Sequence, residues 1–379
     1  MEETVTTNKP TIRNSSFEVL RIIAILFIIF HHFAMHGLFD FSIYDSNSAL
    51  IVINSTWIDL LSQLGKIGVN LFMLISGYFL CSRNNFKFKK LLSMVIEMVI
   101  FATIFGISLL IYKHQKPEFV NFELMLFPLG TRLWWFMTAY LILYIFSPFI
   151  NRALSKTSQQ LHLTLVLILL IMWSVLITFL DLNYEFNNIG WFFTLYMLAS
   201  YIRKYDISLK MKPVFAILIS FLIFGLAFTI RTTLIQVVKT SNAFTDRVMI
   251  WFDMVSNQHN AVQVLSTLFL FLGFKSINMK NSKVINFISA STLTIYIFHD
   301  HYFMREIIWV NLLKVNTFAN SNCLIPYTFA CVVMVFAAGF AVYIIYKYTI
   351  GLGVNKLLDK GQEKAFSKVD RLFNGENEV

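Results

Sequence analysis

Charged residues are scarce in this sequence. They make up 14% of its 379 residues, whereas an average soluble chain has about 25%. Hydrophobic residues make up 57%, and the mean hydropathy is +0.66. So little charge excludes an ordinary water-soluble fold for most of the chain. Apolar runs of the roughly 20 residues that a bilayer span needs recur along nearly the whole sequence, which leaves no room for a separate soluble domain.

The sequence also lacks a cysteine pattern, a signal-peptide cleavage site and an internal repeat. Its three cysteines, Cys81, Cys323 and Cys331, have no metal-ligand spacing, so we predict neither a disulfide framework nor a metal site. The N-terminus has no small-residue cleavage site and its apolar run reaches full span length, which predicts a signal anchor rather than a removable signal peptide. No internal repeat is visible, and this weighs against the inverted-repeat transporters.

The apolar runs predict an all-α, polytopic membrane protein of about ten transmembrane helices. The two shortest candidate spans, which are the sixth and the eighth, leave nine or eleven helices open as alternatives. The predicted spans are 17–37, 60–80, 91–112, 133–151, 161–180, 189–203, 213–231, 260–274, 287–304 and 325–346.

The formal net charge of +10 is unevenly distributed along the chain. With the N-terminus in the cytoplasm, inner segments hold about 21 of the 31 lysines and arginines, and outer segments hold about 8. This bias favours a membrane orientation with both termini in the cytoplasm, rather than binding to nucleic acid. The predicted parts are a cytoplasmic N-terminal arm (1–16), a transmembrane domain (17–346) and a basic cytoplasmic tail (347–379) that forms a helix on the inner leaflet.

The first predicted span is apolar except for Glu18, Arg21, His31, His32 and His36. Ionisable groups at such depths are costly and are usually functional. Arg21 and His32 are 11 residues apart, so they share one helix face about 16 Å apart along the axis. A histidine beside a hydroxyl acceptor can take the proton as the oxygen attacks a carbonyl. Alternatively, Arg21 is an interfacial anchor and His32 bonds a neighbouring helix.

His31 points about 100° away from His32 around the same helix. We interpret it as a packing or supporting residue, although the sequence leaves the choice between the two histidines open.

Five motifs, in this order, resemble those of the membrane-bound acyltransferase family 3, which includes enzymes that O-acetylate bacterial surface polysaccharides. The first is a basic residue, ten intervening positions and a histidine, matched by Arg21 and His32. The others are GVNLFMLISGYFL, the basic stretch FKFKK, WWFMTAYLILYIFSPFIN and STLTIYIFHDHY. Within the second motif the matching residues are Gly68, Phe72, Ser76 and Gly77.

This chain departs from the family pattern in two respects. Lys87, Lys89 and Lys90 stand where the family commonly has paired arginines, and a lysine cannot hold a phosphate bidentately. We also expect no extracytoplasmic hydrolase-like domain, which many relatives append. Acceptor recognition would then lie in the membrane domain, its outer loops or a partner protein.

The resemblance implies an O-acyltransferase that takes an acyl group, most often acetyl, from acyl-CoA. The acceptor would be a hydroxyl of a cell-surface or exported polysaccharide or of its lipid-linked precursor. His32 would act as general base or carry the acyl group transiently, and Arg21 would hold the donor's phosphates or orient its carbonyl. We take His32, Arg21 and His31 as catalytic candidates and expect no tightly bound cofactor.

The predicted donor-binding residues are basic and follow the second span. An equally open alternative is a plain positive-inside loop beside anionic lipid. These residues are Arg83, Lys87, Lys89 and Lys90.

Two further groups are candidates for substrate binding. His299 and Asp300, with Arg305 nearby, form a dense polar group at the outer end of the ninth predicted span. Asp300 could orient a histidine there, or the group is a solvated helix end. Trp135 and Tyr140 suit the stacking of sugar rings, although an aromatic belt at the membrane interface explains them as well.

Glu97 and Lys66 lie inside predicted spans, and we interpret them as paired structural or pathway charges.

A transporter or flippase of a lipid-linked sugar is the main alternative function, since intramembrane charges can line a substrate path without bond chemistry. It does not explain the order of the motifs. The acyltransferase reading places the protein in a bacterial plasma membrane, with acyl-CoA, a sugar acceptor, membrane lipids and other polysaccharide-assembly proteins as partners.

Overall fold

The computed structural model describes residues 14–82, 86–112, 119–180, 188–240, 257–361 and 366–375. Within these ranges all regular structure is helical, and no strand occurs. Seven helices are long and apolar enough to cross a membrane, so the prediction of a polytopic all-α protein is confirmed. The count of ten and the cytoplasmic termini stay predictions. The seven are Ser15–His36, Ala49–Leu80, Phe88–Tyr112, Trp135–Ser155, Gln159–Thr178, Pro213–Ile235 and Leu324–Tyr348.

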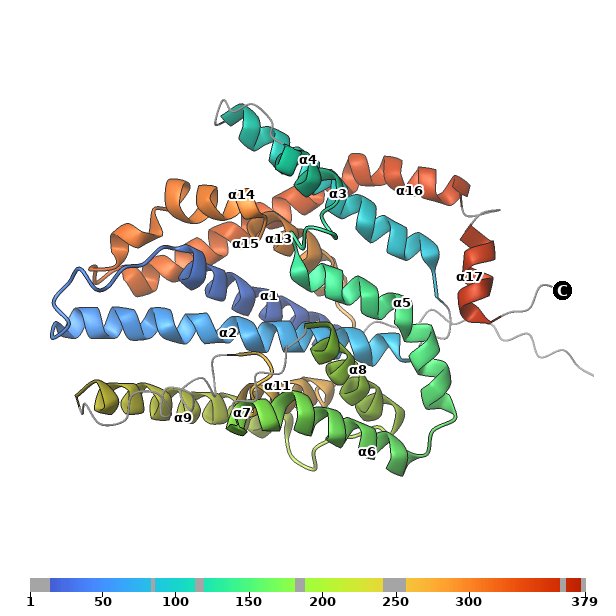
Figure 1. Cartoon of the computed structure of the whole chain (residues 1–379), viewed down its shortest axis with the longest axis horizontal. Coiled ribbons are helices and arrows are strands. Elements are labelled where there is room, and N and C mark those ends of the chain that lie inside the picture. Colours follow the sequence, from blue (N-terminus) through green and yellow to red (C-terminus); the bar gives the residue numbers. More distant parts are fainter. Residues whose placement is uncertain are drawn as a thin grey trace, which may run out of the picture.

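Two helices pack side by side through the middle of the molecule, α1 (Ser15–His36) and α2 (Ala49–Leu80) (Figure 1). The side chain of Asn14 accepts a hydrogen bond from the backbone N–H of Ser16 at 3.0 Å, which satisfies a free donor at the start of α1. Helix α2 begins 11 residues before the predicted span at 60. Because α2 is 32 residues long, it extends about 48 Å, longer than a bilayer core.

Two groups of helices flank this central pair (Figure 1). On one side lie α3 (Phe88–Tyr112), α13 (Thr292–His299) and α15 (Leu324–Tyr348). On the other side α11 (Ala261–Lys275) packs against α9 (Pro213–Thr240) and α2. Five further α-helices lie between α3 and α9 along the described chain: α4 (Phe119–Leu126), α5 (Trp135–Ser155), α6 (Gln159–Leu170), α7 (Leu176–Leu180) and α8 (Asn188–Lys204).

The ninth predicted span, 287–304, is not one continuous helix. It is divided among α12 (Lys283–Ser289), α13 and α14 (Tyr302–Arg305). At the first break the hydroxyl of Ser291 donates to the carbonyl of Ile288 at 2.6 Å, and such local bonds compete with helix propagation. Interrupted helices at membrane depth are tolerated where they are buried in protein or line a cavity.

The predicted tail is helical, in α16 (Ile350–Gly361) and α17 (Ser367–Asn374). Helix α17 covers the start of α3, because the side chain of Asp370 accepts from the backbone N–H of Phe88 at 2.7 Å. Leu357 is 72% exposed, as expected for a helix on a lipid surface, whereas Leu358 is buried against the protein. A position of this tail on the inner leaflet stays a prediction.

Candidate active site

A cavity of about 310 Å³ lies beside α1, and both residues of the predicted pair line it. Arg21 and His32 line it from α1, and Trp135 and Tyr140 line it from α5. His31 lines it as well. No aspartate or glutamate of the described residues lines the cavity. The walls are therefore mainly apolar and carry only basic and neutral polar groups, as suits a site for an anionic or polar ligand.

Arg21 is held in place by an acid on its own helix. Its guanidinium Nη1 donates to both carboxylate oxygens of Glu18, at 3.0 and 3.1 Å. Glu18 is 5% exposed, and its Oε2 also accepts from the hydroxyl of Ser289 at 2.5 Å. The guanidinium carbon lies 5.8 Å above the centre of the Phe79 ring. These contacts fix the charged head of Arg21 at the wall of the cavity.

His32 is joined to a second histidine, and the chain of bonds defines its tautomer. Nδ1 of His299 lies 2.6 Å from the carbonyl oxygen of Ile295, and a carbonyl only accepts, so Nδ1 carries the proton. In neutral His299 the other nitrogen, Nε2, is then an acceptor. It lies 2.9 Å from Nδ1 of His32, which must donate. Neutral His32 therefore has its lone pair on Nε2, the atom that could act as a base or a nucleophile.

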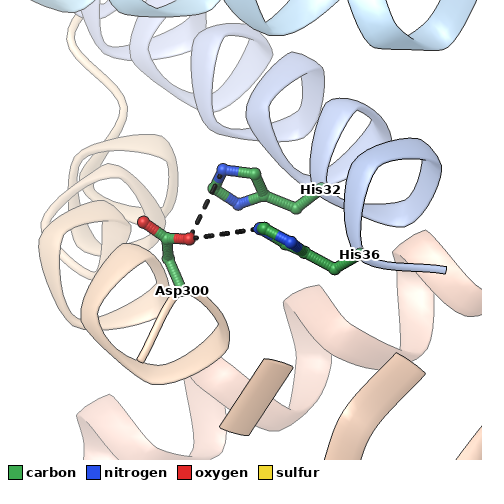
Figure 2. Close-up of side chains that lie close together, drawn as sticks. All are labelled: His32, His36 and Asp300. Atoms are coloured by element: carbon green, nitrogen blue, oxygen red, sulfur yellow. Dashed lines mark ion pairs between the residues drawn. The ribbon is translucent and has the colours of Figure 1, made fainter. Parts of the chain in front are cut away.

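A buried carboxylate stands beside this nitrogen. Oδ1 of Asp300 lies 3.5 Å from Nε2 of His32 and 3.7 Å from Nε2 of His36 (Figure 2). Arg305 contacts the same oxygen with Nε at 2.9 Å and Nη2 at 2.8 Å. A negative charge at this distance attracts a positive charge that forms on the His32 ring. The arrangement can therefore accept a proton on His32 and stabilise the resulting imidazolium.

His32, His36 and Asp300 also offer three ligand atoms that lie within 4.8 Å of one another. Such a set is close enough to hold a metal ion. The Asp300 oxygen in this set already accepts from Arg305, however, and a guanidinium there repels a divalent cation. The donors thus fit a network of hydrogen bonds better than they fit a metal.

His31 lies on a different side of α1. Its Nδ1 is 2.5 Å from the carbonyl oxygen of Ser62 on α2. This bond ties α1 to α2 and orients the ring of His31 at the edge of the cavity. The geometry fits the interpretation of His31 as a supporting residue, and the assignment stays a prediction.

His299 and Asp300 lie against His32 instead of forming a solvated helix end. They are 0% and 1% exposed, respectively. This position suits the idea that Asp300 orients a histidine. Their assignment to substrate binding stays a prediction.

The basic loop lies apart from the cavity. None of the three described lysines, Lys87, Lys89 and Lys90, lines it. Lys89 forms an ion pair with Asp359 of α16, and Lys90 lies 5.1 Å above the ring of Tyr144. Arg83 lies outside the described residues. Donor binding by these residues stays a prediction.

The sequence placed His36 on the same face of the first span as Arg21 and His32. It gave no reason to name His36 as a site residue, because its neighbour Asp300 comes from a distant part of the chain. Arg305 was visible as part of a polar group, but its contact with Asp300 depends on how the chain turns after α13. Glu97 forms no ion pair with any described residue, and accepts instead from the hydroxyl of Thr294 at 2.9 Å.

Comparison with protein families gives a match that spans most of the chain. A family model described as an acyltransferase domain matches residues 14–346. No curated protein and no solved structure gives a significant match.

Proposed function

This chain belongs to the membrane-bound acyltransferase family 3, and from this premise we propose the reaction that it catalyses. It transfers an acyl group, most simply acetyl, from acyl-CoA to a hydroxyl group. The acceptor is a cell-surface or exported polysaccharide, or its lipid-linked precursor, at the plasma membrane of a bacterium. Trp135 and Tyr140, which line the cavity, provide the flat faces on which a sugar ring stacks.

One observation carries the proposal: a single cavity is lined by both Arg21 and His32. Arg21 is near the start of α1 and His32 is near its end. A thioester bound along this face would have its anionic part near the guanidinium and its carbonyl near the imidazole. The acceptor would approach from the histidine end.

The proposed chemistry uses Nε2 of His32. The acceptor hydroxyl attacks the thioester carbonyl carbon while its proton moves to Nε2, and Asp300 stabilises the imidazolium that forms. When the tetrahedral intermediate collapses, the C–S bond breaks, the electron pair leaves on sulfur, and the proton passes from Nε2 to that thiolate. In the alternative route the same Nε2 attacks first and carries the acyl group before the hydroxyl takes it.

The test compares surface glycans from a strain that lacks this chain with those from its parent by NMR. Complementation with His32→Ala should fail to restore acyl signals, because general-base catalysis contributes about 10²–10⁴-fold. His31→Ala is the matched control and should restore them at least in part. The membrane fraction of each variant is assayed for the protein.

Normal glycan acylation in the His32→Ala strain would refute this mechanism. A glycan that is absent from the surface of the deletion strain, rather than present without acyl groups, would favour the transporter alternative instead. The position of the missing acyl signal identifies the acceptor sugar.

A further inference from the structure

Lys66 is an intramembrane cation that has no counterion among the described residues. It lies in the middle of α2, within the second predicted span (60–80), and lines the same cavity as His32. In the part of the chain that the structure describes, Lys66 makes no hydrogen bond and no ion pair. An ammonium group in such a position is costly, and is retained mainly where it serves a function.

Among the described residues, Arg21 on the cavity wall has a carboxylate partner and Lys66 has none. Arg21 is neutralised by Glu18, whereas no described carboxylate lines the cavity near Lys66. The cavity therefore has a local excess of positive charge. An anionic oxygen of a bound molecule would remove this excess, because it would accept hydrogen bonds from the ammonium.

The position of Lys66 along α2 identifies which end of the cavity carries this charge. Its neighbour Gly65 packs against His31, whereas Gly68 packs against Ala24 and Ile28, nearer the start of α1. Lys66 is thus level with the histidines and away from Arg21. The unpaired ammonium belongs to the end where the proposed chemistry takes place.

We propose that Lys66 binds the oxygen of the acyl group during transfer, an inference that rests on the proposed function. As the acceptor oxygen bonds to the carbonyl carbon, the π electrons of the carbonyl move onto its oxygen. Lys66 donates a hydrogen bond to this oxyanion and neutralises it. When the C–S bond breaks, the electrons return to form the ester carbonyl and Lys66 is again unpaired. A charge that is compensated only in the transition state accelerates the reaction without tightening substrate binding.

The first test separates kcat from KM. Transfer of radiolabel from acetyl-CoA to the host's glycan fraction is measured with membranes that contain Lys66→Met. We expect kcat to fall by about 10²–10³-fold, the usual effect of removing one oxyanion donor, while KM for acetyl-CoA stays unchanged. Lys347→Met is the control, because Lys347 lies 4.5 Å above the ring of Phe287 and does not line this cavity.

The same variant should be more stable than the wild-type protein. Removing an uncompensated buried charge should raise the Tm of the purified protein, whereas loss of a structural lysine would lower it. A lower Tm or a failure to fold would overturn the proposal, as would an unchanged kcat.

Chemical rescue tests the hydrogen bond directly. In Lys66→Ala, methylammonium should restore part of the lost kcat, because it is a cation that donates hydrogen bonds. Tetramethylammonium has the same charge without a donor and should not restore it. Equal rescue by both ions, or an effect of Lys66→Met on KM alone, would show that Lys66 instead binds a charged part of a substrate. If the wild-type protein itself transfers no acetyl group, the proposed function fails; if it does and the Lys66 variants match it, only this inference fails.

Discussion

His32 owes its reactive lone pair to a second histidine. His299 presents an acceptor to Nδ1 of His32 only because its own Nδ1 proton is engaged by the carbonyl of Ile295. The protein thus fixes the tautomer of the proposed base through a backbone atom. His299 is a positioning residue by this argument, since its contact with the site passes through His32.

Replacing His299 therefore tests the tautomer. His299→Leu removes the acceptor, and we expect kcat for acyl transfer to fall by about 10²-fold, at the lower end of what a general base contributes. His299→Gln keeps an oxygen that accepts from Nδ1 of His32 and should recover most of that loss. The measurement is the rate of label transfer from acetyl-CoA with both variants at equal membrane abundance. Equal losses in the two variants would indicate a packing role instead.

The Arg21–His32 spacing was accessible from the sequence, since residues 11 positions apart in a helix share a face. The partners of His32 were not accessible in the same way. His299 and Asp300 follow it by 267 and 268 positions, and their contact depends on how α13 packs against α1. Asp300 was a candidate because it belongs to the dense polar group at the end of the ninth predicted span, where a carboxylate could orient a histidine. The pairing itself is a property of the tertiary structure.

At the scale of elements, the approach of α1 to α2 depends on glycine. A Cβ atom added at Gly68 would lie 2.6 Å from the backbone oxygen of Ala24 and 3.0 Å from Cγ1 of Ile28. A backbone oxygen cannot move aside as the end of a flexible side chain can. The two helices that carry the proposed catalytic residues would therefore have to separate.

We predict that Gly68→Ala destabilises the protein and reduces acyl transfer. Overpacking costs about 1–3 kcal/mol, which exceeds the roughly 0.5–1 kcal/mol that alanine gains over glycine within a helix. The Tm of the purified protein should fall. Gly225→Ala in α9 is the matched control: nothing lies within 4 Å of its added Cβ, so its Tm should stay level or rise. A Tm of Gly68→Ala at or above that of the control would contradict the close-packing argument.

Helix positions followed from hydropathy because a membrane helix must be apolar over its whole span. The first and third predicted spans begin within three residues of α1 and α3. The ninth predicted span is not one helix. The hydroxyls of Ser291 and Thr292 bond to nearby backbone carbonyls at the point where it is interrupted. Hydropathy does not register such local bonds.

At the scale of the whole molecule, the number of spans depends on the short helices. Helices α8 and α11 have 17 and 15 residues, which gives lengths of about 26 and 22 Å. Both fall short of the roughly 30 Å of a bilayer core. They are shielded by longer neighbours, since α11 packs against α9 and α2, and α8 packs against α2 and α5. A short helix in such surroundings can cross a membrane without exposing its ends to lipid.

The sidedness of the chain tests this argument, because an even number of spans leaves both termini on one side. We predict that green fluorescent protein fused after Val379 fluoresces, as it does in the cytoplasm. Alkaline phosphatase fused after Ser42, in the loop between α1 and α2, should be active outside the membrane, and the same enzyme after Val379 should be inactive. The excess of lysine and arginine in the segments assigned to the inner side gives the physical reason. Phosphatase activity at both positions would mean an odd number of spans, and one of the short helices would then not cross.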